Sequence, residues 1–372
     1  MDKKRSKLMI LLTVVFLLAT GCWDSARVND LNLSTMVILD KTGEEFTFLV
    51  EIPTIAPSSA ESGPPSSKNT YIRGSGQSFP LARDDLETRF EHPLFLGTVR
   101  TLTVTERAAE NDLAEYLFRQ RESPEYRQKI ILTTTKEEPN VLIKFENETE
   151  SPLGYAVDNM LATATLNGRT FTMTTARYVG DILNRRGFVI HCIGLKEKQL
   201  ALTGYSVFRD AKLAGFIPAE EARGLVFLLA DEPRWIYRVP FGDNHATVEV
   251  KIAGKKIVPD YQQDDARFSV EVDFSAMVLY FSKVLLFPLN EQAMQEISAN
   301  LQQVLEEEIR GTIERSQKEF QSDYLLFGES FRIAYPDVYD GMDWVEEYPH
   351  AQMEVKTKID LSITSKMNLE PK

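Results

Sequence analysis

The sequence predicts an α+β fold in which mixed and antiparallel sheets pack with helices in two to three small domains. Strand and helix patterns alternate through the first half without a repeat, which leaves an α/β arrangement open for that half. In the second half, apolar and polar residues alternate with the period of half-buried antiparallel strands. One long amphipathic helix follows them, so the C-terminal domain is expected to carry this helix on an antiparallel sheet.

The chain begins with the pattern of a lipoprotein signal peptide. Basic residues gather between positions 3 and 7, and an apolar run follows at 8–19. This run is too short to span a hydrocarbon core, which takes about 20 residues. Small residues then lead to Gly21 and Cys22, as a lipoprotein peptidase requires. We expect residues 1–21 to be removed and Cys22 to carry a diacylglyceryl group, with an ordinary secretory signal and a chance cysteine as the alternative.

Lipidation at Cys22 predicts that the protein is held on the outer face of a membrane. Two acyl chains give a stable anchor where one chain would not. No later stretch of the sequence is long and apolar enough to span a bilayer. Cys192, the second of the two cysteines, then lacks a disulfide partner, and its apolar surroundings predict a buried core thiol.

In the first half of the exported chain, strands are expected at 31–40 and 46–52, with a tight turn from Asp40 to Gly43. The stretch 53–68 is rich in Pro, Ser and Gly. It is interpreted as a long loop, and an interdomain linker is the alternative. Further strands are predicted at 69–73, 94–105, 129–135 and 187–194, and helices at 79–89, 108–119, 155–166 and 174–184.

The second half begins with a predicted hairpin whose turn is at residues 209–211. Pro218 suits the first turn of a helix that runs to about residue 229. The remaining predicted strands lie at 248–252, 268–274 and 353–363. The change of pattern near residue 200 divides the exported chain into an N-terminal α+β region at 22–199, which could hold two subdomains, and a C-terminal α+β domain at 200–372.

The long helix is the strongest secondary-structure prediction. Its apolar residues recur every three or four positions and form one face of about 30 residues, roughly 45 Å long. Asn290 is expected to cap its start, and Gly311 marks a candidate bend. Glu306 to Glu308 are assigned to the solvated face. The apolar face is interpreted as core, with a docking surface for a partner subunit as the alternative; its residues are Met294, Ile297, Leu301, Val304, Leu305, Ile309, Ile313 and Phe320.

The composition excludes some classes of function. Residues 1–372 include 42 basic and 55 acidic residues, for a net charge of −13. So acidic a protein is repelled by nucleic acid and by anionic lipid head groups. No basic stripe with interleaved aromatic residues is present, so no nucleic-acid partner is expected.

The sequence shows no catalytic or cofactor motif. It contains no HExxH motif, nucleophile elbow, P-loop or dinucleotide fingerprint, and Gly74 and Gly76 are explained by turn geometry. We therefore predict no enzyme activity, cofactor or metal, and Cys22 is the one site residue. The histidines are scattered without ligand spacing, at His92, His191, His245 and His350. A group of carboxylates is interpreted as an exposed acidic loop, with a calcium site lacking EF-hand spacing as the alternative; it comprises Asp337, Asp340, Asp343, Glu346 and Glu347.

Several segments resemble one family. The opening at 22–31, Cys-Trp-Asp-Ser-Ala-Arg-Val-Asn-Asp-Leu, resembles that of the Ger(x)C (GerAC-like) lipoproteins, the C subunits of spore germinant receptors, although Arg27 and Val28 stand where Glu and Leu are usual. The hairpin at 204–216 is similar to the family's Lys-Leu-x-Gly hairpin. The segment 322–328, Ser-Asp-Tyr-Leu-Leu-Phe-Gly, is similar to the start of the family's C-terminal signature. Trp344 and Tyr348-Pro349 follow it, as in that signature.

This resemblance implies a non-catalytic lipoprotein subunit that assembles with the membrane-embedded A and B subunits of a germinant receptor. It implies a location in the spore inner membrane, a role in nutrient-triggered germination, and a fold of three small α+β domains. It carries no catalytic residue and no cofactor. The alternative function is a lipid-anchored solute-binding protein of a transporter. That class usually has two similar doubly wound lobes, which a long helix beside an antiparallel sheet disfavours.

Overall fold

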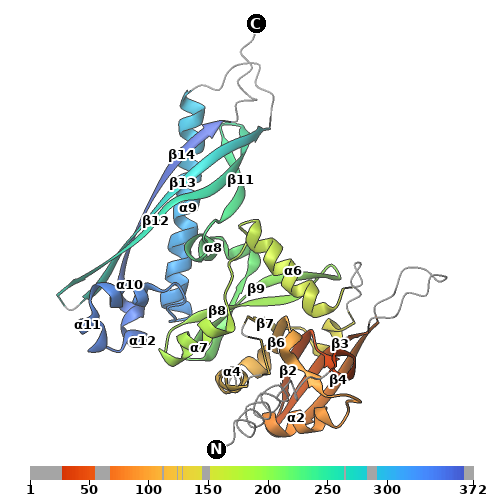
Figure 1. Ribbon diagram of the computed structural model, residues 1–372. Helices are drawn as coiled ribbons and strands as arrows, with labels where there is room; N and C mark the ends of the chain where they lie inside the picture. The colour runs from red at the N-terminus through yellow and green to blue at the C-terminus, as the bar shows by residue number, and fades with distance from the viewer. Residues whose placement is uncertain are drawn as a thin grey trace, which may run out of the picture.

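The computed structural model describes residues 27–54, 68–110, 113–123, 125–127, 129–144, 151–263, 265–282 and 291–363. The described chain forms two main sheets with their helices (Figure 1). One sheet has eight strands in the order β10-β9-β8-β7-β6-β2-β3-β4, and the other has four in the order β11-β12-β13-β14. A short parallel pair, β1 (Asn32–Leu33) and β5 (Leu94–Phe95), lies apart from both. The predicted α+β class is confirmed.

The eight-stranded sheet is parallel in its centre and antiparallel at both sides. The four central strands are β2 (Met36–Thr42), β6 (Thr101–Thr105), β7 (Ile131–Thr135) and β8 (Phe188–Lys196). The flanking strands are β3 (Glu45–Thr54), β4 (Lys68–Gly76), β9 (Gln199–Arg209) and β10 (Lys212–Pro218).

Helices cover both faces of this sheet. One face packs against α2 (Phe79–Glu87), α3 (Glu106–Ala109), α4 (Leu113–Glu122) and α7 (Thr175–Leu183). The other face packs against α5 (Pro139–Leu142) and α6 (Leu153–Leu166). Strand β2 shows why the sequence requires both layers. Val37 and Leu39 enter one apolar cluster, and Met36 and Ile38 enter the other, so the strand is a continuous apolar run.

Most predicted elements of the first half are present, with three differences. The single strand expected at 31–40 is divided into β1 and β2, which belong to different sheets. The single strand expected at 94–105 is divided into β5, the 3-10 turn η2 (Leu96–Thr98) and β6. The single helix expected at 108–119 is divided into α3 and α4. The opening of the described chain is the short turn η1 (Val28–Asp30). Residues 55–67 of the predicted loop lie outside the described residues.

The predicted boundary at residue 200 falls within a hairpin of the large sheet. Strands β8 and β9 pair antiparallel from Phe188–Phe208 to Lys196–Gln199, and Glu197 and Lys198 make the turn with positive φ. Strand β10 extends the same sheet as the hairpin predicted around Asp210. The division into regions 22–199 and 200–372 stays a prediction.

The four-stranded sheet contains β11 (Arg234–Phe241), β12 (Asn244–Gln262), β13 (Asp265–Phe281) and β14 (Gln352–Ile363). The sequence did not predict β11. The expectation of a purely antiparallel sheet is wrong at one edge, because β14 pairs parallel with β13. A parallel pair requires a crossover connection, and the long helix α9 (Glu291–Glu314) is part of it. Figure 1 shows α9 running along this sheet.

The apolar face of α9 is buried, so the core interpretation is confirmed. Ile297, Leu301, Leu305 and Ile309 are 0% exposed. Val304 was assigned to that face wrongly, since it is 39% exposed. Asn290, the expected cap, lies outside the described residues.

The helix departs from α geometry a little after the predicted bend at Gly311. A π-helical turn, η4 (Arg315–Glu319), continues α9 at its C-terminal end. Such turns often occur at functional sites. The segments around the helix are η3 (Ala219–Glu221), α8 (Arg223–Leu229), α10 (Phe327–Ala334), α11 (Pro336–Asp340), α12 (Trp344–Glu347) and η5 (Tyr348–His350).

One apolar cluster joins the two sheets. It contains the buried face of α9 and the inner faces of β11 to β13, and it also contains Val189 of β8 and Tyr205 and Val207 of β9. The four-stranded sheet and α9 are therefore packed against strands β8 and β9 of the large sheet.

Candidate functional site

The predicted lipidation site, Cys22, lies outside the described residues. None of the helices in the described part of the chain combines the length and apolar character that crossing a bilayer requires. The other cysteine, Cys192, is free and 1% exposed in β8, as predicted. Burial raises the pKa of its thiol, which makes this cysteine a poor nucleophile.

His191 has a structural role beside Cys192. Its Nε2 lies 2.8 Å from the Thr170 hydroxyl, which also lies 2.8 Å from the hydroxyl of Tyr205. Burial lowers the pKa of His191 to about 4, so the ring is neutral at physiological pH. Within the described residues, no three His, Cys, Asp or Glu side chains form a group that could hold a metal ion.

The predicted acidic segment is exposed, but it is not a loop, because Asp337 and Asp340 lie in α11 and Glu346 and Glu347 in α12. Two of its carboxylates contact arginines at the ends of the β8–β9 hairpin. Asp343 pairs with Arg185 at 3.2 Å, and Glu346 pairs with Arg209 at 3.0 Å. The Asp343 side chain also accepts the Val345 backbone N–H at the start of α12. These contacts give Asp343 and Glu346 a role in joining the C-terminal segments to the large sheet.

The segment at 322–328 is organised by the buried carboxylate of Asp323. It accepts the backbone N–H of Phe327 at 2.9 Å and of Gly328 at 2.6 Å, and the indole N–H of Trp344 at 2.8 Å. Gly328 leaves room for this indole, because an added Cβ would lie 2.4 Å from Trp344 Nε1. Burial raises the pKa of Asp323 to about 6, although the three donors oppose the shift.

The neighbouring contacts bring together the segments that resembled the family signature. The Ser322 hydroxyl donates to the carbonyl of Phe208 in β9 at 2.7 Å. The hydroxyls of Ser316, in the π-helical turn, and Tyr348 lie 2.5 Å apart. The hairpin, the end of the long helix, Trp344 and Tyr348 therefore meet at one junction.

Charged side chains cross the same junction between α7 and α10. Arg177 pairs with Asp181 at 3.2 Å and with Glu329 at 2.9 Å. Arg186 lies 3.8 Å and 3.6 Å from the same two carboxylates. Burial raises the pKa of Asp181. It also acts to raise that of Glu329, but the hydrogen bond and charge of Arg177, together with the charges of Arg186 and Arg332, outweigh burial and lower this pKa.

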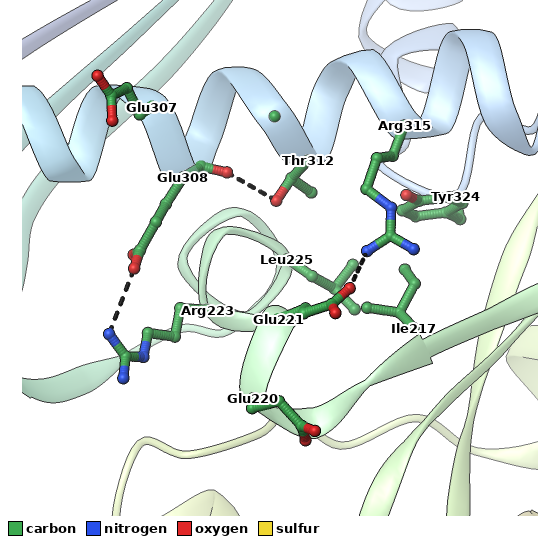
Figure 2. Close-up of a pocket in the computed structure, with 11 residues that line it drawn as sticks. Ile217, Glu220, Glu221, Arg223, Leu225, Glu307, Glu308, Thr312, Arg315 and Tyr324 are labelled. Carbon is green, nitrogen blue, oxygen red and sulfur yellow. Dashed lines mark hydrogen bonds and ion pairs between the residues drawn. The ribbon is translucent and has the colours of Figure 1, made fainter.

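A cavity of about 260 Å³ lies between α9 and the turn that leads into α8 (Figure 2). Two ion pairs form parts of its wall, Arg315–Glu221 at 2.8 Å and Arg223–Glu308 at 3.3 Å. Tyr324 also lines it, and the buried Tyr324 hydroxyl has no hydrogen-bond partner among the described residues.

Glu308, which the sequence assigned to the solvated face, is half-buried at this cavity. Its carboxylate accepts a hydrogen bond from the Tyr237 hydroxyl of β11, and burial raises its pKa. Thr312 donates to the Glu308 backbone carbonyl at 2.8 Å. In Figure 2 the Glu307 and Glu220 carboxylates point away from the space between the two segments. Apolar and charged side chains both line this cavity, and it is smaller than the typical range of about 300–1,000 Å³ for ligand sites.

A second cavity, of about 230 Å³, lies between β3, α2 and α4. Phe48, Phe79 and Tyr116 form an aromatic wall, with Phe48 and Phe79 ring centroids 5.6 Å and 5.4 Å from that of Tyr116. Arg83 lies at its rim, where it pairs with Glu87 and Glu125.

Sequence reasoning missed Asp323 and Glu308 as buried groups. Asp323 accepts N–H groups four and five residues ahead, whereas capping motifs place the acceptor two or three residues before the donor. Glu308 sits among glutamates, and its partner Tyr237 is 71 residues away. The segment containing Asp323 could be singled out, but only through its resemblance to a family.

Comparisons with known proteins match most of the chain. A family model described as "Spore germination protein N-terminal domain" matches residues 24–195, and one described as "Spore germination B3/GerAC like, C-terminal" matches 203–365. Two proteins of Bacillus subtilis (strain 168) are similar: YfkR at 18% identity over 85% of each chain, and spore germination protein B3 at 17% over 91% of each. The crystal structure of the GerBC protein has a similar fold, with a TM-score of 0.56 and 14% identity, over 88% of this chain and 97% of that one.

Proposed function

The chain belongs to the GerAC-like family of spore germination proteins, and from this premise we propose that it is the non-catalytic lipoprotein subunit of a spore germinant receptor. The observation that carries the proposal is that the two family models follow each other in order, over 24–195 and 203–365. In this role the protein contributes to receptor assembly and to nutrient-triggered germination. Its partners are the membrane-embedded A and B subunits.

The proposed anchor is Cys22, with fatty acyl chains such as palmitate on its diacylglyceryl group. The support for it is the basic cluster, short apolar run and small residues that precede Cys22. Two acyl chains are sufficient for stable attachment, so the folded body lies on the outer face of the spore inner membrane. The acidic composition makes attraction to anionic lipid a poor substitute for this anchor.

The test compares tagged Cys22→Ala with tagged Cys192→Ala in dormant spores. Cys192→Ala removes the other cysteine and is the matched control. We expect the unmodified chain and Cys192→Ala to fractionate with membranes and to co-purify with the A and B subunits. Cys22→Ala should be released from the membrane or retain its signal peptide, and should lose both partners.

Two results would contradict the proposal. Cys22→Ala that stays in the membrane fraction with its signal peptide removed would show that Cys22 is not the anchor. Co-purification of the unmodified chain with transporter subunits instead of receptor subunits would favour the solute-binding alternative.

A further inference from the structure

Two arginines lie over one tryptophan where the two sheets meet, and a third arginine lies nearby on the adjoining strand. Trp235 is the second residue of β11. The guanidinium carbon of Arg169 lies 4.6 Å from the centre of its ring, and that of Arg223 lies 5.5 Å from it. Arg234 precedes Trp235 in the strand and so points to its opposite face. Its link to the cluster is its positive charge, which acts on Arg169. In a chain with a net charge of −13, such a concentration of positive charge calls for a physical reason.

Backbone contacts hold Arg169 in this place. It follows α6, whose C-terminal end lies beside α8 and the start of β11 in Figure 1. The Gly168 carbonyl accepts the Arg234 N–H at 3.0 Å. Gly168 has a φ of +67°, and a Cβ there would lie 2.4 Å from the Glu232 carbonyl oxygen, so glycine is required for this close approach. The position of Arg169 is thus set by the fold.

The positive charges of the cluster are only partly neutralised. Arg223 pairs with Glu308 at 3.3 Å, and Arg234 pairs with Glu249. Arg169 forms no ion pair with any described residue. Its electrostatic neighbours are both other arginines, whose effect on its pKa is larger, and Glu249 and Tyr237, which oppose them. Burial, followed by the charges of Arg234 and Arg223, lowers the pKa of Arg169.

Two N–H donors in the cluster are buried without an acceptor. Neither the indole Nε1 of Trp235 nor the Nε of Arg223 has a hydrogen-bond partner among the described residues. Buried donors are almost always paired, and an unpaired one calls for an explanation such as a bound water or ion. An oxyanion would supply an acceptor for the two buried N–H donors. It would also supply a negative charge beside the guanidinium of Arg169, which has no ion pair.

We propose that Arg169, Arg223 and Trp235 form a binding site for the carboxylate or phosphate group of a small solute, with Arg234 adding positive charge nearby. The bound oxyanion accepts N–H groups from Arg169, Arg223 and the indole, and it links the end of α6 to β11 and α8. This proposal does not depend on the lipid anchor or on receptor assembly.

Indole N–H resonances test the site directly. The full chain, ¹⁵N-labelled and held in nonionic detergent, contains three tryptophans, Trp23, Trp235 and Trp344. The Trp235 signal is assigned by its loss in Trp235→Phe. Potassium phosphate and potassium acetate are titrated separately at constant ionic strength, balanced with potassium chloride. The Trp344 indole, already bonded to Asp323, is the internal reference.

We expect the Trp235 signal to shift and saturate with phosphate, acetate or both, while the Trp344 signal stays in place. The more effective anion identifies the chemical group that the site prefers. Arg169→Gln should raise the half-saturating concentration about tenfold or more, since it removes a charge-assisted hydrogen bond. Arg238→Gln, on the same strand but bonded to His245, should leave it unchanged.

The unmodified chain alone can overturn the proposal. A Trp235 signal that does not move with either anion would show that the cluster is not an oxyanion site. A signal that shifts by the same amount when potassium chloride alone is titrated would show the same. Equal saturation in Arg169→Gln, with an unchanged Trp344 signal as evidence of folding, would remove Arg169 from it.

Discussion

At the scale of single residues, burial determines which carboxylates matter, and the sequence does not display burial directly. Asp323 and Glu308 were not distinguishable from surface acids by spacing. Their partners, Trp344 and Tyr237, come from other elements of the fold. Cys192 was predictable because its own strand is apolar on both sides, so local pattern alone predicts its burial.

Asp323 gives a residue-level prediction of pH dependence. Its folded pKa of about 6 lies above the unfolded value of about 3.9, so the folded state binds the proton more tightly. The stabilising contribution is fully present below about pH 4 and is lost as the pH rises through about 6. The free energy of unfolding of the unmodified chain, measured relative to Asp323→Asn, should therefore fall by about 2–3 kcal/mol between pH 4 and 7. Denaturant titrations at several pH values measure this difference, and a difference that grows with pH would contradict it.

At the scale of elements, periodicity identified helices and strands well but did not identify how they pair. The two periodic strands that became β12 and β13 and the long helix α9 were all predicted. The parallel pairing of β14 with β13 was not, since register and direction depend on the crossover made by α9. Strand β11 was missed although Tyr237, Val239 and Phe241 alternate with exposed residues.

The buried face of α9 predicts an asymmetric response to substitution. Ile309 is 0% exposed, and truncating a buried isoleucine to alanine typically costs about 2–5 kcal/mol, with a charge costing more. Against a total stability of about 5–15 kcal/mol, Ile309→Asp should largely unfold the protein. Glu307 is exposed, so Glu307→Lys should change the free energy of unfolding by about 0.5 kcal/mol or less. Thermal melts of both variants decide the matter, and an unchanged midpoint for Ile309→Asp would contradict the core assignment.

At the scale of the whole molecule, the two predicted regions share structure across residue 200. The β8–β9 hairpin spans the boundary, and one apolar cluster includes β8, β9 and α9. Arg177 and Glu329 link α7 to α10. We propose that regions 22–199 and 200–372 are distinct in sequence but unfold as one cooperative unit.

Two glycines make this proposal testable. A Cβ at Gly187, just before β8, would lie 2.2 Å from Ser322 Oγ and 2.8 Å from the Asp323 backbone nitrogen, so Gly187→Ala forces the regions apart. Overpacking of this kind typically costs about 1–3 kcal/mol. Gly180 lies in α7, where a Cβ meets nothing within 4 Å, so Gly180→Ala should be neutral or stabilise by up to about 1 kcal/mol.

Calorimetry should show one unfolding transition for the unmodified chain, and Gly187→Ala should lower its midpoint without dividing it. A single transition is expected because Gly187 of the first region packs closely on Ser322 and Asp323 of the second, and Arg177 pairs with Glu329 across the same boundary. Displacing Ser322 and Asp323 therefore weakens both regions together. Two resolved transitions, of which Gly187→Ala lowers only one, would instead show that the regions on either side of residue 200 fold independently. Gly180→Ala shows whether a shift in the midpoint comes from adding a methyl group or from disturbing the packing between the regions. It adds the same methyl group to the same half of the chain, so destabilisation confined to Gly187→Ala must come from the packing between the regions.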